Sequence, residues 1–362
     1  MSASAGHQRA AILGFAAATP VGYALEPTLA AMGANLSHIS ASPVRTLDGE
    51  PAPVSCLLDP AMPRAERFAR LFEHGLADLR ALLSAHGIES APLLLGLPAG
   101  LDSAARADIV AVQHGAGFRT PDDALFAYGR ASAFAALAHA LPLLQQRQHR
   151  CVIVGGLDSL CAPASVEALV HARRVLEPFT EGTIPGEAAS FVALLQPDDA
   201  AVDPDHALWL DGVAVARGSG FEAAERVEAE GLTRVLHRLA KTAGEADAEA
   251  DGEARRVHRV VAAHSGEGYF GRSFSLACLR AVDLMPEPLE VTLTADRVGD
   301  VGAASGALGM AFAAYLMVRE LQSRPGPRRA LVYTESDGGE VGAAVLHGRP
   351  RTWKRTGLSS GA

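Results

Sequence analysis

Several residues and motifs that mark common protein classes are scarce or missing from this sequence of 362 residues. Phe, Trp and Tyr make up only 5% of it, so Ala, Leu and Val must build most of the core. A net charge of −9 argues against a nucleic-acid partner, because phosphate binding needs clustered Lys and Arg. The four cysteines lack Cys-x-x-Cys spacing, which predicts neither a zinc site nor a disulfide framework and favours a reducing cytoplasm. They are Cys56, Cys151, Cys161 and Cys278.

Membrane and catalytic signatures are also missing. Residues 10–21 faintly resemble a signal peptide, but Pro20 and the glycines favour a first strand and loop. The longest apolar run, residues 301–318, carries glycines and is interpreted as a buried helix rather than a membrane span. The chain holds no Walker lysine and no His-Glu-x-x-His, so we expect no cofactor and no metal.

Strand and helix patterns alternate along the chain, which predicts an α/β protein with a largely parallel sheet. Residues 43–63 are expected to be loop, and residues 244–254 an acidic, Ala-rich loop. The predicted strands are residues 11–16, 92–97, 151–154, 190–195, 207–216, 257–263, 289–293, 330–333 and 341–346. The predicted helices are residues 25–32, 65–86, 124–144, 231–243, 274–282 and 301–321.

An internal repeat links the two ends of the chain. A small-residue helix beginning near Gly129 leads to a strand, and a second strand then begins at Gly186-Glu187. A small-residue helix beginning at Gly302 likewise leads to a strand, followed by one beginning at Gly339-Glu340. This pattern predicts two copies of one unit, residues 1–200 and 201–362, with an extra stretch at about 157–185 in the first copy.

Two features next to the strand that ends near residue 263 suggest chemistry. Gly266-Glu-Gly268-Tyr-Phe-Gly271 follows this strand and precedes a helix, as in a dinucleotide fingerprint, although this motif alone is weak. His264 lies at the carboxyl end of the strand, where active sites of α/β proteins form. Dinucleotide binding through these glycines and catalysis by His264 are therefore both kept as hypotheses.

An ordered set of motifs resembles the β-ketoacyl-acyl-carrier-protein synthases, or ketosynthases. The resemblance implies the thiolase fold: two pseudo-symmetric βαβαβαββ halves that form an α-β-α-β-α layered core. It also explains the internal repeat. The motifs are Ala11-Ile-Leu-Gly-Phe with Met32-Gly-Ala-Asn, Val152-Ile-Val-Gly-Gly-Leu-Asp, Leu176-Glu-Pro-Phe-Thr with Ile184-Pro-Gly-Glu-Ala-Ala, Ala263-His264-Ser-Gly, Gly299-Asp300-Val-Gly-Ala-Ala-Ser-Gly-Ala and the closing pair Gly338-Gly339.

The departures from the family's motifs concern its catalytic residues. Arg130 falls, within one residue, on the position of the acylated cysteine, and Asp300 falls on the second catalytic histidine. Ala295 takes the place of the family's lysine, so Glu187 must find another partner, for which Arg297 is the nearest substitute. Of the catalytic set, only His264 remains.

A protonated arginine cannot form the thioester on which this chemistry depends. The resemblance therefore implies a ketosynthase-like chain that has lost condensing activity and acts as a non-catalytic partner, scaffold or adaptor. An acyltransferase or hydrolase that uses His264 as a base with Ser265 or Asp300 is the alternative. We also expect Arg130 to pair with Asp300, with Glu187 or the loop of residues 335–337 as substitutes.

The implied partners follow from the same resemblance. We expect a homodimer, or a heterodimer with a related chain, whose interface includes the strand Cys151–Val154. A basic rim formed by Arg173, Arg174 and the terminal run of residues 349–355 would suit an acyl carrier protein. A protein of a secretion or biosynthetic gene cluster is a further possible partner.

Overall fold

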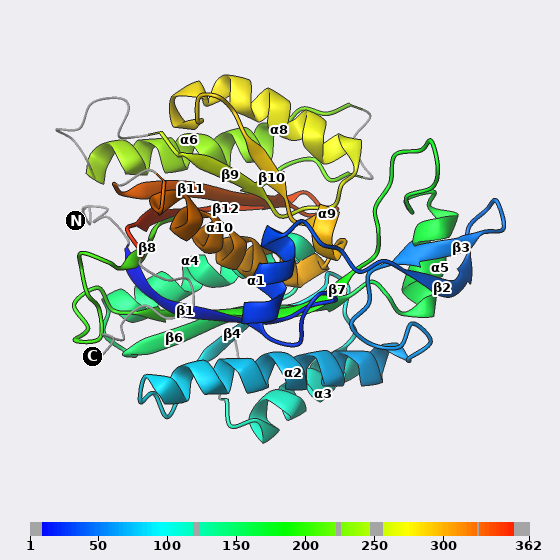
Figure 1. Ribbon diagram of the computed structural model, residues 1–362, viewed down its shortest axis with the longest axis horizontal. Coiled ribbons are helices and arrows are strands. Elements are labelled where there is room, and N and C mark those ends of the chain that lie inside the picture. Colours follow the sequence, from blue (N-terminus) through cyan, green and yellow to red (C-terminus); the bar gives the residue numbers. More distant parts are fainter. Residues whose placement is uncertain (1–8, 119–123, 222–225, 247–255, 324–325, 351–362) are drawn as a thin grey trace.

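The helices and strands of the computed structural model stack as α-β-α-β-α layers (Figure 1). The model describes residues 9–118, 124–221, 226–246, 256–323 and 326–350. Helices α2 and α3 cover one outer face and α6 and α8 the other, while α1, α4 and α10 lie between the two layers of strands (Figure 1). A separate apolar core fills each space between layers, and the central core is built largely on the small residues of α4 and α10.

The strand order repeats about the middle of the molecule. In the described residues the sheet runs β10-β9-β11-β12-β8-β1-β7-β6-β4-β5, so the order on one side of the β8–β1 junction mirrors the order on the other. The junction is narrow, since β1 pairs with β8 only from Ala10 to Ile12. These halves agree with the implied thiolase fold, and the division of the chain between residues 200 and 201 remains a prediction.

Nine of the ten strands of the sheet agree with the predicted ones in place, and several are longer; β5 lies inside the helix predicted over 124–144. The extra stretch of the first copy is present between β6 and β7, whereas β11 and β12 are joined by a short turn. The bounds of the ten are β1 Ala10–Ala18, β4 Leu93–Gly96, β5 Leu125–Phe126, β6 Cys151–Ser159, β7 Glu187–Leu195, β8 Leu208–Arg217, β9 Arg259–Ala262, β10 Val291–Leu293, β11 Arg328–Glu335 and β12 Glu340–Gly348.

The helices include three that the sequence patterns did not reveal, α3, α5 and the short α9. Helix α8 begins at Gly268 rather than near residue 274. Helix α6 continues to Ala246, so residues 244–246 of the predicted acidic loop are helical. The rest of that predicted loop lies outside the described residues. The bounds are α1 Leu25–Gly33, α2 Arg64–Ala85, α3 Ser103–Gly115, α4 Ser132–Gln145, α5 Pro163–His171, α6 Glu230–Ala246, α8 Gly268–Arg280, α9 Ala295–Val298 and α10 Ser305–Leu321.

The prediction of a largely parallel sheet is wrong, because the sheet is mixed. Strand β9 is parallel to β10 and β11, and β4 is parallel to β5 and β6. The pairs that involve β1, β7, β8 or β12 are antiparallel. Only the last strand of each copy, β7 or β12, therefore runs against the other strands of its copy, which alternation of strands and helices alone does not reveal.

Two further predictions of local structure need correction. Residues 43–63 are not only loop, because a separate hairpin of β2 (Ser40–Arg45) and β3 (Pro51–Val54) begins before and extends into them. The helix predicted over 124–144 begins at Ser132, after β5 and a 3-10 turn, Gly129–Ala131. Within the residues that the structure describes, every helix is too short or too polar to cross a bilayer.

Candidate functional site at the junction of the two halves

The site begins at the 3-10 turns that precede α4 and α10. The turn Gly129–Ala131 contacts its counterpart, Gly302–Ala304, and Gly129 and Gly302 have positive φ angles of 64° and 50° that favour glycine. The Ser132 hydroxyl donates to the carbonyl oxygen of Leu97 at 3.0 Å and so ties the start of α4 to the segment after β4. Two helix starts from opposite halves of the chain therefore meet at one point.

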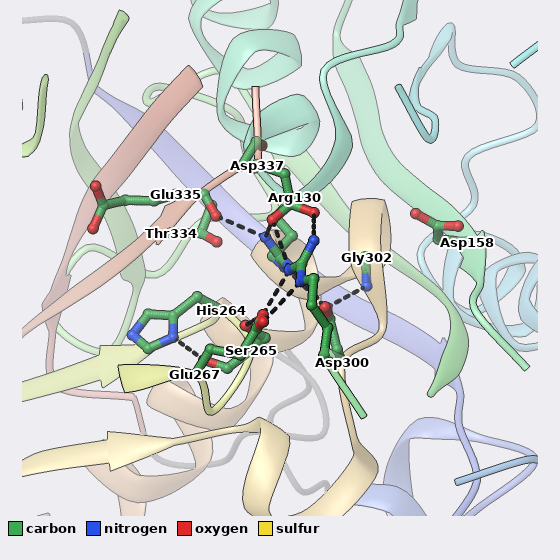
Figure 2. A network of polar contacts seen from close by, with 12 residues as sticks. Arg130, Asp158, His264, Ser265, Glu267, Asp300, Gly302, Thr334, Glu335 and Asp337 are labelled. Carbon is green, nitrogen blue, oxygen red and sulfur yellow. Dashed lines mark hydrogen bonds and ion pairs between the residues drawn. The ribbon is translucent and has the colours of Figure 1, made fainter. Parts of the chain in front are cut away.

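Arg130 and Asp300 form the ion pair that the motif comparison predicts. Arg130 Nη2 donates to Asp300 Oδ2 at 2.7 Å, and Nε lies 3.0 and 3.1 Å from the two carboxylate oxygens (Figure 2). Arg130 is only 5% exposed and Asp300 only 2%. Burial opposes the charge of Arg130, but the neighbouring carboxylates raise its pKa well above the usual range. The guanidinium is therefore held permanently charged inside the molecule.

Asp300 is fixed from three sides. Its Oδ1 accepts from the backbone N–H of Gly302 at 3.0 Å, at the start of the second 3-10 turn. Its backbone N–H donates to Ile184 O at 2.8 Å, and its carbonyl accepts from Gly186 N at 2.9 Å. The segment before β7 in the first half therefore holds the carboxylate of the second half in place.

The loop between β11 and β12 closes the other side of Arg130. Arg130 Nη1 donates to Asp337 Oδ1 at 2.8 Å and to the carbonyl oxygen of Glu335 at 3.2 Å. Ser336 Oγ accepts from the backbone N–H of Ala131 at 2.9 Å, which bonds the same loop to the turn. The loop of residues 335–337, expected as a substitute partner, thus joins Asp300 rather than replacing it.

A second arginine, Arg174, continues the network away from Arg130. Its Nε and Nη2 donate to Glu267 Oε1 and Oε2 at 2.7 and 2.6 Å, and its Nη1 donates to Asp337 Oδ2 at 2.7 Å. The hydroxyl of Ser265 donates to Glu267 Oε2 at 2.7 Å. Arg174 is only 9% exposed and is therefore not part of a basic rim, which corrects that expectation; Arg173 is exposed.

His264 is buried beside the network and is joined to it through Ser265 (Figure 2). Its Nε2 lies 3.2 Å from Tyr333 Oη, and its Nδ1 contacts the carbonyl oxygen of Ser265 rather than the hydroxyl. Burial lowers the pKa of His264 to about 4, so the imidazole is neutral near pH 7. The predicted Ser265–His264 arrangement is not formed, because the Ser265 hydroxyl is directed to Glu267.

Two other carboxyl groups near the site are unusual. Burial raises the pKa of Glu335 to about 7, although Ser273 Oγ donates to its Oε2 at 2.9 Å. Burial also raises the pKa of Asp158 to about 7; its Oδ2 accepts from Ala303 N at 2.9 Å, and the charge of Asp300 adds to the shift. Both groups therefore titrate in a range where an exposed carboxyl group is fully ionised.

Glu187 belongs to a second buried ion pair, away from Arg130. Its Oε2 accepts from Arg67 Nη1 and from Ser159 Oγ, both at 2.7 Å, and its Oε1 accepts from the N–H groups of Leu57 and Leu58 at 2.8 and 2.9 Å. The partner of Glu187 is thus Arg67 of α2, and the expectation of Arg297 is wrong. Arg297 instead donates to the carbonyl oxygens of Met32 and Leu293.

Two buried thiols lie beside Glu187, although the cysteine spacing in the sequence gave no sign of it. The ligand atoms of Cys56, Cys161 and Glu187 all lie within 4.8 Å of one another. The four hydrogen bonds to Glu187 already occupy about all the lone-pair sites of a carboxylate. Burial raises the pKa of Cys161 well above its usual value, which disfavours the thiolate that a metal ion requires. This chemistry fits packing better than metal binding.

The glycine motif of residues 266–271 has a setting unlike that of a phosphate-binding loop. Glu267 is the N-cap of α8, and its carboxylate is paired with Arg174 instead of capping the helix, so the loop already carries a negative charge beside the helix start. A side chain at Gly268 would displace the flexible carboxylate of Glu181. The glycine there makes room for a carboxylate, and the motif offers no seat for a pyrophosphate.

Comparison with known proteins gives no sequence family. Neither the protein-family models nor the curated proteins contain a match to this chain. Solved structures do match, among them ketosynthases at 12–19% identity. The chain shares its fold with ketosynthases, which is the thiolase fold that the motifs implied.

Three of these structures cover nearly the whole chain. The ishigamide ketosynthase/chain length factor is 19% identical, with a TM-score of 0.66, and the match covers 93% of this chain and 98% of that one. A ketosynthase in complex with its chain length factor from Xenorhabdus doucetiae is 16% identical, with a TM-score of 0.70, covering 96% and 99%. A type II polyketide ketosynthase in complex with its acyl-carrier protein is 12% identical, with a TM-score of 0.73, covering 94% and 99%.

Proposed function

We propose that this chain is a non-catalytic thiolase-fold protein that acts by pairing with another protein. The observation that carries the proposal is the bidentate ion pair of Arg130 and Asp300 at the junction of the two halves. These residues fall on the positions of the nucleophile and of the second histidine in the ketosynthase motifs. Both side chains are buried and hydrogen-bonded to each other, so the pair replaces a reactive centre with a structural one.

The remaining groups at this point do not supply the missing chemistry. An arginine is no nucleophile near neutral pH, and Arg130 is held more firmly in its charged form by its neighbours. His264 has the basicity of a weak base, with a pKa of about 4. Among the described residues no cysteine lies at the start of α4, since Cys151 is on β6 and Cys161 follows it. The alternative of acyl transfer or hydrolysis through His264 therefore receives no support.

The partner that suits this fold best is a related thiolase-fold chain, in a homodimer or a heterodimer. Several structural neighbours are ketosynthases described together with a chain length factor. The expected interface strand needs correction: both edges of β6 are paired, with β4 and β7, and Cys151–Val154 are at most 3% exposed. In the described residues the edge strands of the sheet are β5 and β10. We therefore propose the edge of β5, in the same half as β6, as the dimer interface in place of β6.

A direct experiment tests the loss of covalent catalysis. The purified full chain is incubated with radiolabelled acyl-CoA and with acyl-carrier protein, and its intact mass is then measured. An active ketosynthase handled in parallel is the control and must show the acyl adduct. We expect this chain to remain unmodified because Arg130 stands where the thioester would form. A stoichiometric adduct on any residue would contradict the proposal.

Light scattering tests the pairing. A mass of twice the chain at micromolar concentration supports a homodimer, and a mass that doubles only when a related chain is added supports a heterodimer. A charged substitution at the β5 edge, Phe126→Glu, is expected to abolish the doubling, while Val291→Glu on the opposite edge strand β10 leaves it unchanged. A monomer under all these conditions would overturn the pairing.

A further inference from the structure

The carboxylate of Asp337 has a position unlike that of the other charged groups in the network. It lies between Arg130 and Arg174: Oδ1 accepts from Arg130 Nη1 at 2.8 Å and from Arg174 Nη2 at 3.2 Å, and Oδ2 accepts from Arg174 Nη1 at 2.7 Å. Its side chain is 39% exposed, compared with 6% for Arg130 and 10% for Arg174. Asp337 is thus the point at which a buried network reaches the surface.

The charges show that Asp337 is the exchangeable member. Two guanidinium groups face three carboxylates, and each arginine already has a bidentate partner of its own, Asp300 for Arg130 and Glu267 for Arg174. If Asp337 swung away, neither arginine would be left as an unpaired buried charge. The outward-facing donors of both arginines would instead point together toward solvent.

Aromatic rings form the wall behind these donors. The guanidinium of Arg174 lies 4.5 Å from the ring centroid of Phe221, and that of Arg130 lies 5.0 Å from the ring of Phe270. The two rings are stacked, with centroids 5.8 Å apart, and Tyr269 packs edge-on against both. The rings hold the planar guanidinium groups in a fixed orientation.

The backbone of the turn leaves the Asp337 side chain able to move by itself. The carbonyl oxygen of Asp337 accepts from Phe221 N at 2.8 Å, and Ser336 N donates to Glu340 O at 2.8 Å. The turn then passes through Gly338 to Gly339, whose φ of 90° favours glycine. Rotation of one side chain, with the main chain held, is sufficient to expose the arginine donors.

We propose that Arg130 and Arg174 form a binding site for the carboxylate of a small organic acid, which binds in place of Asp337. Paired guanidinium groups match the planar geometry of a carboxylate, and Asp337 shows that a carboxylate fits. The neighbouring rings of Phe221 and Tyr269, both partly exposed, favour an acid with a compact apolar body over acetate. The exchange replaces one anion by another, so it needs no proton transfer and no change in the net charge of the site.

The test measures binding of phenylacetate and acetate to the full chain by titration calorimetry at constant ionic strength. Asp337→Ala removes the internal competitor, so we expect it to bind phenylacetate at least tenfold more tightly than the wild type, and acetate less tightly than phenylacetate. Adding Arg174→Lys, which keeps the charge beside Glu267 but loses the planar fork, is expected to weaken binding at least tenfold. The matched control is Asp198→Ala, which frees the exposed Arg147 and is expected to behave as the wild type.

Two results would overturn the proposal: equal binding by Asp337→Ala and Asp198→Ala, or binding of inorganic phosphate without binding of either carboxylate. Should Asp337→Ala fail to fold, the comparison is made between the wild type and Arg174→Lys. The wild type must then bind phenylacetate saturably, and Arg174→Lys must bind it at least tenfold more weakly. Binding of an acid does not require lost catalysis, so an acyl adduct in the mass experiment would contradict the proposed function and leave this site untouched.

Discussion

Arg67 with Glu187 and Arg130 with Asp300 are both buried arginine–carboxylate pairs, and they differ in what surrounds them. The Arg67–Glu187 pair is 0% exposed, and its carboxylate accepts its other hydrogen bonds from a hydroxyl and from backbone N–H groups. The Arg130–Asp300 pair shares its arginine with Asp337, which is 39% exposed. One pair is closed on itself, whereas the other is the inner end of a chain of charges that reaches the surface.

The comparison teaches that burial alone does not decide whether an ion pair is a fixed structural element. Glu187 joins β7 to α2 and to the segment after β3, so losing it disconnects several parts of one half. Asp300 joins the two halves, but Arg130 keeps a second carboxylate if Asp300 is removed. The number of alternative partners, rather than the exposed fraction, should therefore rank the cost of each substitution.

Glu187→Ala is expected to have the largest effect. It leaves Arg67 as an uncompensated charge in a fully buried site, which costs about 3–5 kcal/mol of unfolding free energy. Chemical denaturation of the variant and of the wild type measures the loss. Arg67→Met with Glu187→Leu, which removes both charges together, should cost much less. A loss for Glu187→Ala smaller than that for Asp300→Ala would reverse the ranking.

Asp300→Ala is expected to lower the free energy of unfolding by less, because Asp337 still faces Arg130. The expected loss is about 3 kcal/mol, the low end of the range for broken buried pairs. The double change Arg130→Met with Asp300→Leu should cost much less than the two single losses added together. A double-mutant cycle in urea measures this coupling. Additive losses would show that the two residues do not interact.

Glu335→Gln should sharpen the comparison through pH. The pKa of Glu335 is raised to about 7, so the folded state binds a proton that the unfolded state releases above about pH 4.5. Stability contributed by this group is therefore lost as the pH rises from about 4.5 to 7, by at most about 1.4 kcal/mol per pH unit. His264 acts with the opposite sign between pH 4 and about 6.5, because its pKa is lowered.

At pH 8 the free energy of unfolding of Glu335→Gln is thus expected to be higher than that of the wild type. Between pH 5 and 7 this free energy should fall less steeply in the variant. Urea denaturation at these three pH values gives the comparison. His264→Gln serves as the control of opposite sign, since it should remove a rise in stability between pH 4 and 6.5. Parallel pH profiles for wild type and Glu335→Gln would refute a buried, protonated Glu335.

Asp337→Asn is expected to have the smallest effect, about 1 kcal/mol or less, because its side chain is partly exposed and both arginines keep their own carboxylates. Thermal and urea unfolding would detect a larger loss. Asp337 would then be a fixed element like Glu187, and the distinction between the two networks would fail.

The pairing of Arg130 with Asp300 was predictable because the ordered motifs put opposite charges at two helix starts that the fold brings together. Arg67 carried a weaker signal, since it lies one turn before Leu71 and two before Gly75 on the buried face of α2. A charged residue in such a stripe requires a buried partner, and that signal was missed.

Other features had no signal in the local sequence. Arg174 and Glu267 are 93 residues apart and lie outside any shared periodic pattern, so only the folded loops reveal their pairing. The reversed strands β7 and β12 were missed for the same reason. A strand's direction depends on which neighbour it pairs with, and the strands β1 and β7 that pair here are separated in sequence by most of the first half of the chain.

The pairing of β1 with β7 and β8 also sets an order of events on the ribosome. Strand β1 is made well before its partners in the sheet, Glu187–Leu195 and Leu208–Arg217, which follow nearly two hundred residues later. At typical elongation rates of about 5–20 residues per second, this apolar strand waits roughly 10–40 seconds before it can pair. During that time the apolar sequence Ala10–Ala18, which is buried throughout in the folded chain, has no partner strand, so β1 is exposed to aggregation during synthesis.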